Sequence, residues 1–183
     1  MIVEGFLWVT TWHPSVQRIL YHALYEAMAK WFGHAEYWTL MNYGYVDSDQ
    51  EALELSSADW PERYPIYLYN RIAARVDLHN LDVLEVGSGR GGGASFVKRY
   101  LGARRVLGVD IANSAIAFCQ RVHRVEGLEF RRGDAQELPV ADASFDAVLN
   151  VESAHCYPAF DRFLGEVGTQ SGRIFPVRRH PQR

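Results

Sequence analysis

The spacing of hydrophobic residues changes near residue 80 and divides the chain into two regions. From residue 81 to residue 167, short apolar runs alternate with segments of helical periodicity. Strands separated by helices of this length are typical of a parallel, doubly wound α/β sheet of Rossmann type. The pattern predicts strands at 83–86, 105–110, 128–131 and 145–150, and helices at 93–100, 113–124 and 159–167. Asn113 is the predicted N-cap of the second of these helices.

Before residue 80 the pattern favours helices and aromatic side chains. Apolar residues at helical spacing predict a helix over 16–32 that Gly33 ends, and a second helix from about Tyr64 to Val76. The segment from Trp38 to Val46 is irregular and aromatic. We therefore expect three regions, namely a helical and aromatic cap at 1–80, a ligand-binding core at 81–167 and an unpatterned, disordered tail at 168–183.

Composition narrows the class of protein. The 183 residues carry a net charge of −3, which gives no basic surface for nucleic acid. Cys119 and Cys156 are too few for a disulfide framework and lack the spacing of metal ligands, so we expect a reducing, cytoplasmic setting and no metal. No apolar stretch reaches the roughly 20 residues that span a bilayer, and no secretory signal is visible, so no integral membrane segment is expected.

A glycine-rich loop, residues 87–93, joins the first predicted strand to the following helix. Glycines suit such a loop when the turn is tight and a ligand approaches the backbone closely. Gly87, Gly89 and Gly92 also fit the dinucleotide fingerprint, and Asp110 ends the next strand where a ribose-binding acid is expected. The glycines alone therefore leave a nicotinamide dinucleotide and S-adenosylmethionine (SAM) both open.

Three further features favour SAM. Glu85 lies two residues before Gly87, where its carboxylate would repel a pyrophosphate but suits the ammonium and sulfonium of SAM. Asp134 follows the third strand, where it can accept a hydrogen bond from an adenine amino group. The fourth strand delivers Asn150 and Val151 to the same crevice.

The chain resembles class I SAM-dependent methyltransferases in four runs, VLEVGSGRGGG (83–93), VLGVD (106–110), RGDAQELP (132–139) and SFDAVLNVESAHCYP (144–158). The resemblance implies that the glycine loop holds the methionine part of SAM, that Asp110 binds the ribose, that Asp134 and Ala135 face adenine, and that Asn150 closes the floor. The full set of predicted cofactor-binding residues is Glu85, Gly87, Ser88, Gly89, Gly91, Asp110, Ile111, Asp134, Ala135, Asn150 and, from the cap, Tyr45.

A closer resemblance covers roughly residues 15–167. The runs GRGGGASF (89–96), LPVADASFDAVLNVESAHCYP (138–158) and FDRFLGEV (160–167) are similar to the mycobacterial phthiotriolone/phenolphthiotriolone dimycocerosates methyltransferases. The loop around Ser88 and Arg90 departs from that family. The resemblance implies methyl transfer to a hydroxyl of a long-chain lipid, by a cytoplasmic protein that meets the membrane through its substrate. The aromatic cap fits an apolar acceptor, but the same side chains also suit simple packing of the cap on the sheet.

Methyl transfer from a sulfonium needs mainly proximity and orientation, and a hydroxyl acceptor gains from a general base. His155, on the loop after the fourth strand, is the first candidate for this base because the pKa of histidine lies near neutrality. Glu152 is the second candidate. The alternative for His155 is a structural or surface role.

The last 16 residues lack the turn and fifth apolar strand that class I methyltransferases have at this point. Their basic, unpatterned sequence indicates a change of reading frame after Val167. Two other functions therefore stay open, a truncated, non-catalytic remnant that at most binds SAM and, ranked last, a nicotinamide-dependent oxidoreductase. A fourth strand without a neighbour would also be an aggregation hazard.

Overall fold

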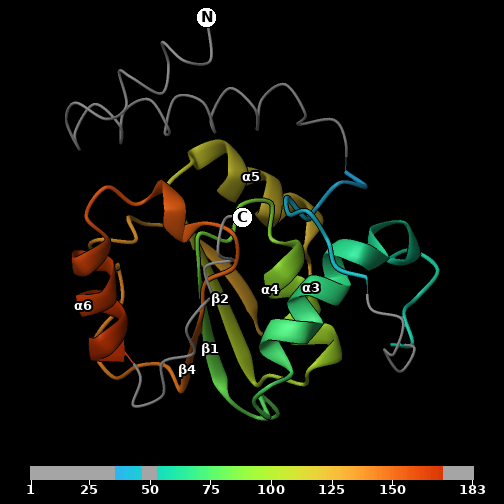
Figure 1. Ribbon diagram of the computed structural model, residues 1–183, viewed down its shortest axis with the longest axis horizontal. Helices are drawn as coiled ribbons and strands as arrows, with labels where there is room; N and C mark the ends of the chain where they lie inside the picture. The colour runs from blue at the N-terminus through green and yellow to red at the C-terminus, as the bar shows by residue number, and fades with distance from the viewer. Residues whose placement is uncertain (1–35, 47–52, 171–183) are drawn as a thin grey trace, which may run out of the picture.

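A computed structural model describes residues 36–46 and 53–170. The predicted helix at 16–32 and most of the predicted tail lie outside these residues. Figure 1 shows a twisted sheet with helices on both sides. Its strands are β1 (Asp82–Val86), β2 (Arg105–Asp110), β3 (Leu128–Arg132) and β4 (Ala147–Leu149), all parallel and in the order β3-β2-β1-β4. The prediction of a parallel, doubly wound α/β fold is confirmed.

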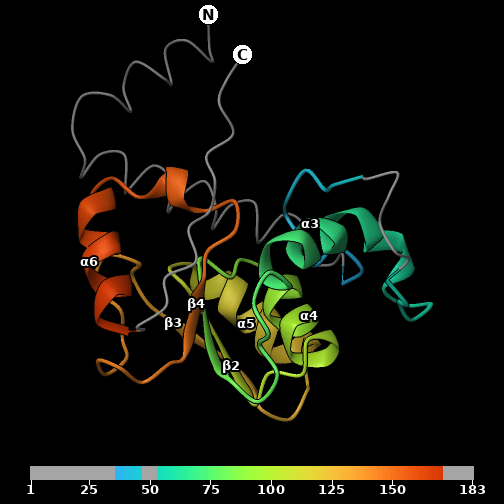
Figure 2. The same ribbon diagram turned by 60° about the horizontal axis from the view of Figure 1, so that its bottom comes forward.

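The helices of the described chain are α3 (Arg63–Ala73), α4 (Gly92–Tyr100), α5 (Asn113–Val122) and α6 (Phe160–Gln170), with one-turn 3-10 helices η1 (Trp60–Glu62) and η2 (Ala154–Cys156). In Figures 1 and 2, α6 lies on one side of the sheet, and α3, α4 and α5 lie on the other. Among the described residues, no helix is both long and apolar enough to cross a membrane.

Alternation along β1 explains the two layers. Val83 belongs to the core on the side of α3, α4 and α5, whereas Leu84 and Val86 belong to the core under α6. Successive strand residues point to opposite faces, so Glu85 points to the same side as Val83. This residue is therefore buried towards the cap helix α3 and not towards α6.

Several predicted boundaries differ from the structure, and α3, for example, ends at Ala73 and not at Val76. Asn113 is the first residue of α5, and the N-cap is Ala112, whose N–H donates to Asp110 Oδ1 at 2.9 Å. The fourth strand is shorter than predicted because it pairs with β1 at only three positions. Helix α6 continues to Gln170, whose side chain is buried, so residues 168–170 belong to the folded core and not to the tail.

Candidate cofactor site

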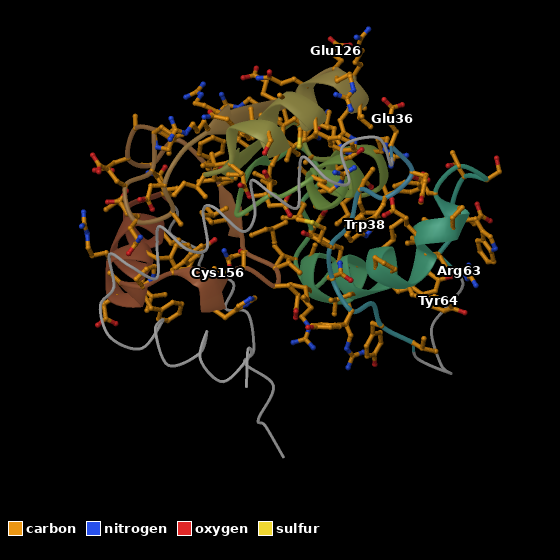
Figure 3. All side chains as sticks on the ribbon, turned by 90° about the horizontal axis from the view of Figure 1, so that it is seen from above. Glu36, Trp38, Arg63, Tyr64, Glu126 and Cys156 are labelled. Atoms are coloured by element: carbon orange, nitrogen blue, oxygen red, sulfur yellow. The ribbon has the colours of Figure 1, made fainter. Side chains whose placement is uncertain are left out.

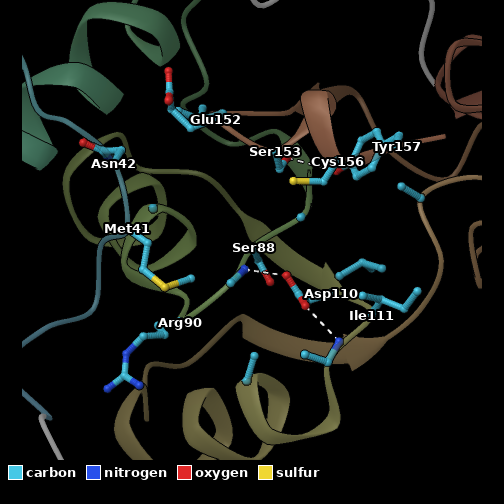
Figure 4. A pocket seen from close by; sticks show the side chains of 18 of the residues that line it. Met41, Asn42, Ser88, Arg90, Asp110, Ile111, Glu152, Ser153, Cys156 and Tyr157 are labelled. Atoms are coloured by element: carbon cyan, nitrogen blue, oxygen red, sulfur yellow. Dashed lines mark hydrogen bonds between the residues drawn. The ribbon is translucent and has the colours of Figure 1, made fainter. Parts of the chain in front are cut away.

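A cavity lies at the carboxyl ends of β1, β2 and β4 (Figure 4). This is the position where open α/β sheets bind ligands, because the chain runs from β1 to β2 on one side and β4 lies on the other. Its lining residues come from seven places in the chain, namely the glycine loop, the ends of β2 and β3, the loop after β4, α3, α5 and the cap segment 38–42.

Asp110 ends β2 and lines the cavity, and both of its carboxylate oxygens are held by backbone. Oδ2 accepts from the Gly89 N–H at 2.8 Å, and Oδ1 accepts from the Ala112 N–H at 2.9 Å, as the dashed lines of Figure 4 show. A carboxylate oxygen accepts more than one hydrogen bond, so each retains capacity for a ligand hydroxyl. The geometry suits an acid that binds a vicinal diol such as a ribose.

The opposite part of the cavity is lined by residues 133–136, after β3. Asp134 Oδ1 accepts from the Gln136 backbone N–H at 2.9 Å, which fixes the carboxylate at the cavity wall. Gln136 in turn accepts from the Ala159 N–H at 2.9 Å and so ties this loop to the start of α6. Asp134 and Ala135, which the resemblance predicts to face adenine, therefore line the cavity, and Ile111 lines it beside Asp110.

Glycine is required at several positions of the loop because side chains from other parts of the chain pack directly against its backbone. Gly87 has φ +74°, and a Cβ there would collide with Ser153 Oγ and the Tyr157 hydroxyl. A Cβ on Gly93 would collide with the ring of Tyr69 and with Glu85. The run of glycines thus admits side chains of the protein itself as well as a ligand.

Glu85 lies beneath this loop with 1% of its surface exposed. Its Oε1 accepts from the Tyr69 hydroxyl at 2.7 Å, and its Oε2 has no hydrogen-bond partner in the described part of the chain. Burial raises the pKa of Glu85 to about 7, against the lowering effect of the Tyr69 hydrogen bond. This carboxylate is therefore poised to ionise near neutral pH.

Residues 38–42, here named the lining strap, form the wall that faces α3. The Glu62 carboxylate accepts from the Thr39 N–H at 2.7 Å, the Thr39 hydroxyl at 2.6 Å and the Leu40 N–H at 2.9 Å. Arg90, from the glycine loop, donates from Nε to the Trp38 carbonyl at 2.6 Å. The strap is thus fixed both to the start of α3 and to the glycine loop.

The arginine of the loop is buried against an aromatic ring. The Arg90 guanidinium lies 3.6 Å from the centroid of Phe118, a stacking contact, and burial lowers its pKa. Its contacts give it a packing role between the strap and α5.

A polar cluster closes the end of the cavity between β1 and β4. Asn150 Nδ2 lies 2.9 Å from the Val86 carbonyl, 2.8 Å from Ser153 Oγ and 2.8 Å from the Tyr157 hydroxyl. Ser153 and Tyr157 line the cavity, whereas Asn150 lies behind them. Burial raises the pKa of Tyr157 well above its ordinary value, so this hydroxyl stays neutral, and it accepts the hydrogen bond from Asn150 Nδ2.

The two predicted catalytic residues are separated by the structure. Glu152, with φ +56°, lines the cavity and is labelled in Figure 4. His155 is exposed in η2 and lies outside the cavity lining, because the single turn of η2 brings Cys156 to the wall instead. Neither His155 nor any other histidine lines the cavity in the described part of the chain.

The predicted cofactor residues fall into two groups. Those that line the cavity are Gly87, Ser88, Gly89, Asp110, Ile111, Asp134 and Ala135. Those that do not are Glu85, Gly91, Asn150 and Tyr45. Tyr45 packs its ring under the Arg71 guanidinium at 4.5 Å and donates its backbone N–H to the Tyr64 carbonyl, so it supports the cap.

Sequence reasoning expected contributions from the cap and from the loop after β4 but missed several of the residues that make them. Tyr69, Ser153, Tyr157 and the lining strap all line the cavity. Figure 3 shows Trp38 of the strap near the middle of the molecule, whereas Arg63 and Tyr64 lie at the outer end of α3. The useful signal was the glycine run, since consecutive glycines at a helix start call for bulky partners from elsewhere in the chain.

Comparison with known proteins agrees with this geometry. Residues 84–169 match the family described as Methyltransferase domain. The chain is 50% identical over 127 residues to the fatty-acid O-methyltransferase of Mycolicibacterium smegmatis, covering 69% of this chain and 46% of that protein. It is 43% identical over 153 residues to the phthiotriol/phenolphthiotriol dimycocerosates methyltransferase of Mycobacterium tuberculosis, covering 84% and 56%. The predicted resemblance is confirmed, and the chain spans about half the length of these relatives.

Among solved structures, the [4+2]-cyclase SpnF superposes with a TM-score of 0.66 at 22% identity, covering 82% of this chain and 55% of that one. This likeness concerns the fold. Because a cyclase shares it, the fold alone does not define the reaction, and the chemistry must be argued from the site.

Proposed function

We propose that this chain, whose residues 84–169 match the family described as Methyltransferase domain, binds SAM and that the protein transfers its methyl group to an oxygen atom of a long-chain lipid. The main observation in favour of SAM is the hydrogen bond from the Gly89 N–H of the glycine loop to the Asp110 carboxylate, since both residues line the cavity. The names of the relatives support the lipid acceptor.

The charges around the loop favour SAM over a nicotinamide dinucleotide. The Gly89 N–H, which would face a pyrophosphate, already donates to the Asp110 carboxylate. Glu85 places a second carboxylate beneath the same loop. Negative charge at this end opposes a phosphate and suits a ligand that carries an ammonium and a sulfonium.

Different residues of the chain are proposed to bind different parts of SAM. Asp110 is proposed to hold the ribose hydroxyls, Asp134 and Ala135 the adenine, and the glycine loop with Ser153 and Tyr157 the methionine part. When bound, SAM supplies an electrophilic methyl group. The protein then has to place the acceptor oxygen in line with that group and exclude water, and proximity of this kind accounts for much of the rate in such displacements.

Two acceptor classes follow from the relatives, a lipid hydroxyl and a fatty-acid carboxylate. A hydroxyl loses a proton during transfer and gains from a base, for which we propose Glu152, with His155 second because it is outside the cavity lining. A carboxylate is already ionised and needs no base. The apolar and aromatic side chains of the strap, Trp38, Leu40 and Met41, support an alkyl-bearing acceptor in either case.

Calorimetric titration of the purified chain with SAM and with NAD tests the cofactor. We expect binding of SAM and none of NAD, and the reverse result would end the methyltransferase proposal. Transfer of labelled methyl groups from SAM to a fatty acid and to a long-chain diol then separates the two acceptors. Binding without transfer to either would favour the non-catalytic alternative.

A further inference from the structure

Tyr69 links the cap to the cofactor loop through a buried contact. It lies on α3, is 6% exposed and lines the cavity with its ring against Gly93. Its hydroxyl donates to Glu85 Oε1 at 2.7 Å. No other residue of α3 lines the cavity.

The Tyr69 hydroxyl contacts one oxygen of the carboxylate, and the Ala94 backbone N–H also lowers the pKa of Glu85. Glu85 Oε2 is buried and has no hydrogen-bond partner in the described part of the chain. An unsatisfied buried oxygen of this kind costs free energy unless a donor meets it. Glu85 lies behind the lining residues Tyr69 and Gly93, so a ligand ammonium near the first glycines of the loop would supply a compensating positive charge across a short distance.

We infer that Tyr69 is a positioning residue for the methionine end of the cofactor, because its hydroxyl holds the Glu85 carboxylate behind Gly93, where the negative charge of the carboxylate attracts the ligand's α-ammonium. This inference rests on the proposed SAM binding and adds a residue of the cap to it. A phenylalanine would keep the ring packing on Gly93 but would leave both oxygens of Glu85 without the hydroxyl.

The surrounding charges set the expected pH dependence. Asp110 faces Glu85 from β2 and raises its pKa together with burial, whereas the Tyr69 hydrogen bond lowers it. Cys119 from α5 stays neutral because burial raises its pKa, and Glu152 and Tyr157 face Tyr69 from the loop after β4. Loss of the hydroxyl therefore raises the pKa of Glu85 and delays its ionisation to higher pH.

Titration with two ligands separates positioning from folding. S-adenosylhomocysteine carries the α-ammonium, whereas 5′-methylthioadenosine has the same nucleoside and sulfur without the amino-acid part. For Tyr69→Phe at pH 7 we expect about tenfold weaker binding of S-adenosylhomocysteine, as for a lost hydrogen bond to a charged group, and unchanged binding of methylthioadenosine. The rise of S-adenosylhomocysteine affinity between about pH 6 and 8 should move to higher pH.

Two controls make the result specific. Tyr64→Phe removes a hydroxyl from the same helix at its exposed end (Figure 3) and should change neither affinity. In a Glu85→Gln background, Tyr69→Phe should no longer alter S-adenosylhomocysteine affinity, since its effect acts through the missing carboxylate.

Equal losses for both ligands, an unmoved pH profile or additive effects in the double variant would each overturn the inference while leaving SAM binding intact. If the unmodified chain binds neither ligand, the proposed function fails, and the inference fails with it.

Discussion

Asp110 is the residue whose role follows most directly from its contacts. Its two oxygens are already oriented by the Gly89 and Ala112 N–H groups, so the carboxylate is fixed before any ligand arrives. Fixed acceptors lose little entropy when a ribose binds. The free energy of binding should therefore depend strongly on this one side chain.

We expect Asp110→Asn to weaken SAM binding by about 1.5–3 kcal/mol, as for hydrogen bonds to a charged group. The amide keeps the size of the side chain but replaces one acceptor by a donor. Calorimetric titration measures the loss, and circular dichroism of the variant checks the fold. Unchanged affinity would show that the end of β2 does not contact the ribose.

Glu85 should make the ligand-free chain less stable at alkaline pH. The pKa of Glu85 is about 7 in the folded chain, whereas the ordinary pKa of a glutamate, which applies to the unfolded chain, is 4.5. The folded state thus binds more protons than the unfolded state between these values, and the free energy of unfolding falls as pH rises from 4.5 to 7. At pH 8 the full cost, about 3 kcal/mol, is present.

Glu85→Gln should therefore raise the melting temperature at pH 8 and have little effect near pH 4.5, while weakening the binding of SAM. Thermal melts at both pH values measure the difference between variant and parent. A variant that is less stable than its parent at pH 8 would show that the carboxylate stabilises the fold instead.

At this scale the sequence predicted the residues that sit at strand ends and failed for those whose position depends on a loop. Asp110 and Asp134 follow β2 and β3 directly, so strand geometry places them at the cavity. His155 and Cys156 are adjacent in sequence, yet only Cys156 lines the cavity, because the turn of η2 decides which faces inward. A single turn of helix is too short for a periodic pattern of apolar residues, so the sequence does not predict which of its side chains face the cavity.

At the scale of elements, the spacing of apolar residues predicted the sheet well because β1, β2 and β4 are mainly apolar and buried on both faces, and β3 alternates buried and exposed residues. It failed at α6, where Gly168 and Thr169 look like a helix end. The helix continues because Gln170 is buried and Thr169 donates its hydroxyl to the Glu166 carbonyl at 2.9 Å. Packing overrides the local preference here.

The lining strap is the element whose position depends most on a single side chain. Glu62 accepts three hydrogen bonds from Thr39 and Leu40. The irregular, aromatic sequence from Trp38 to Val46 predicted no such anchor, because Glu62 lies more than 20 residues away. The strap should open locally when this carboxylate loses its charge.

Glu62→Gln should speed hydrogen exchange at the Thr39 and Leu40 amides by roughly tenfold or more, given the strength of hydrogen bonds to a charged group. Exchange in β1 and β2 should be unchanged, which is the internal reference. Mass spectrometry of peptides that cover residues 36–46 measures the rates. Equal rates in variant and parent would assign the anchoring to Arg90 alone.

At the scale of the whole molecule, the site is built from two regions that fold differently. The sheet supplies the floor of the cavity, with Asp110 and Asp134, while the cap supplies Tyr69 and the strap. The first part was predictable from alternating strands and helices. The second was not, since nothing in the local sequence tells which side of the sheet a helical cap will cover.

The last prediction concerns the free side of β4. In the described part of the chain, β4 hydrogen-bonds only to β1, and its three residues, Ala147, Val148 and Leu149, are apolar and buried. A strand with one row of unpaired N–H and C=O groups beside apolar side chains is a template for pairing with another chain. We expect the purified chain to self-associate as its concentration rises to about 100 µM.

Light scattering after size-exclusion chromatography, over a series of concentrations, measures this association. Pairing through a folded edge should reverse on dilution, whereas aggregation of unfolded chains should not, and this difference identifies the source. Saturating S-adenosylhomocysteine should leave edge pairing in place, because the cavity lies at the ends of the strands and not along the side of β4. A constant monomeric mass with a single cooperative melt would mean that residues outside the described ranges cover this edge, and that β4 is an internal strand of the complete fold.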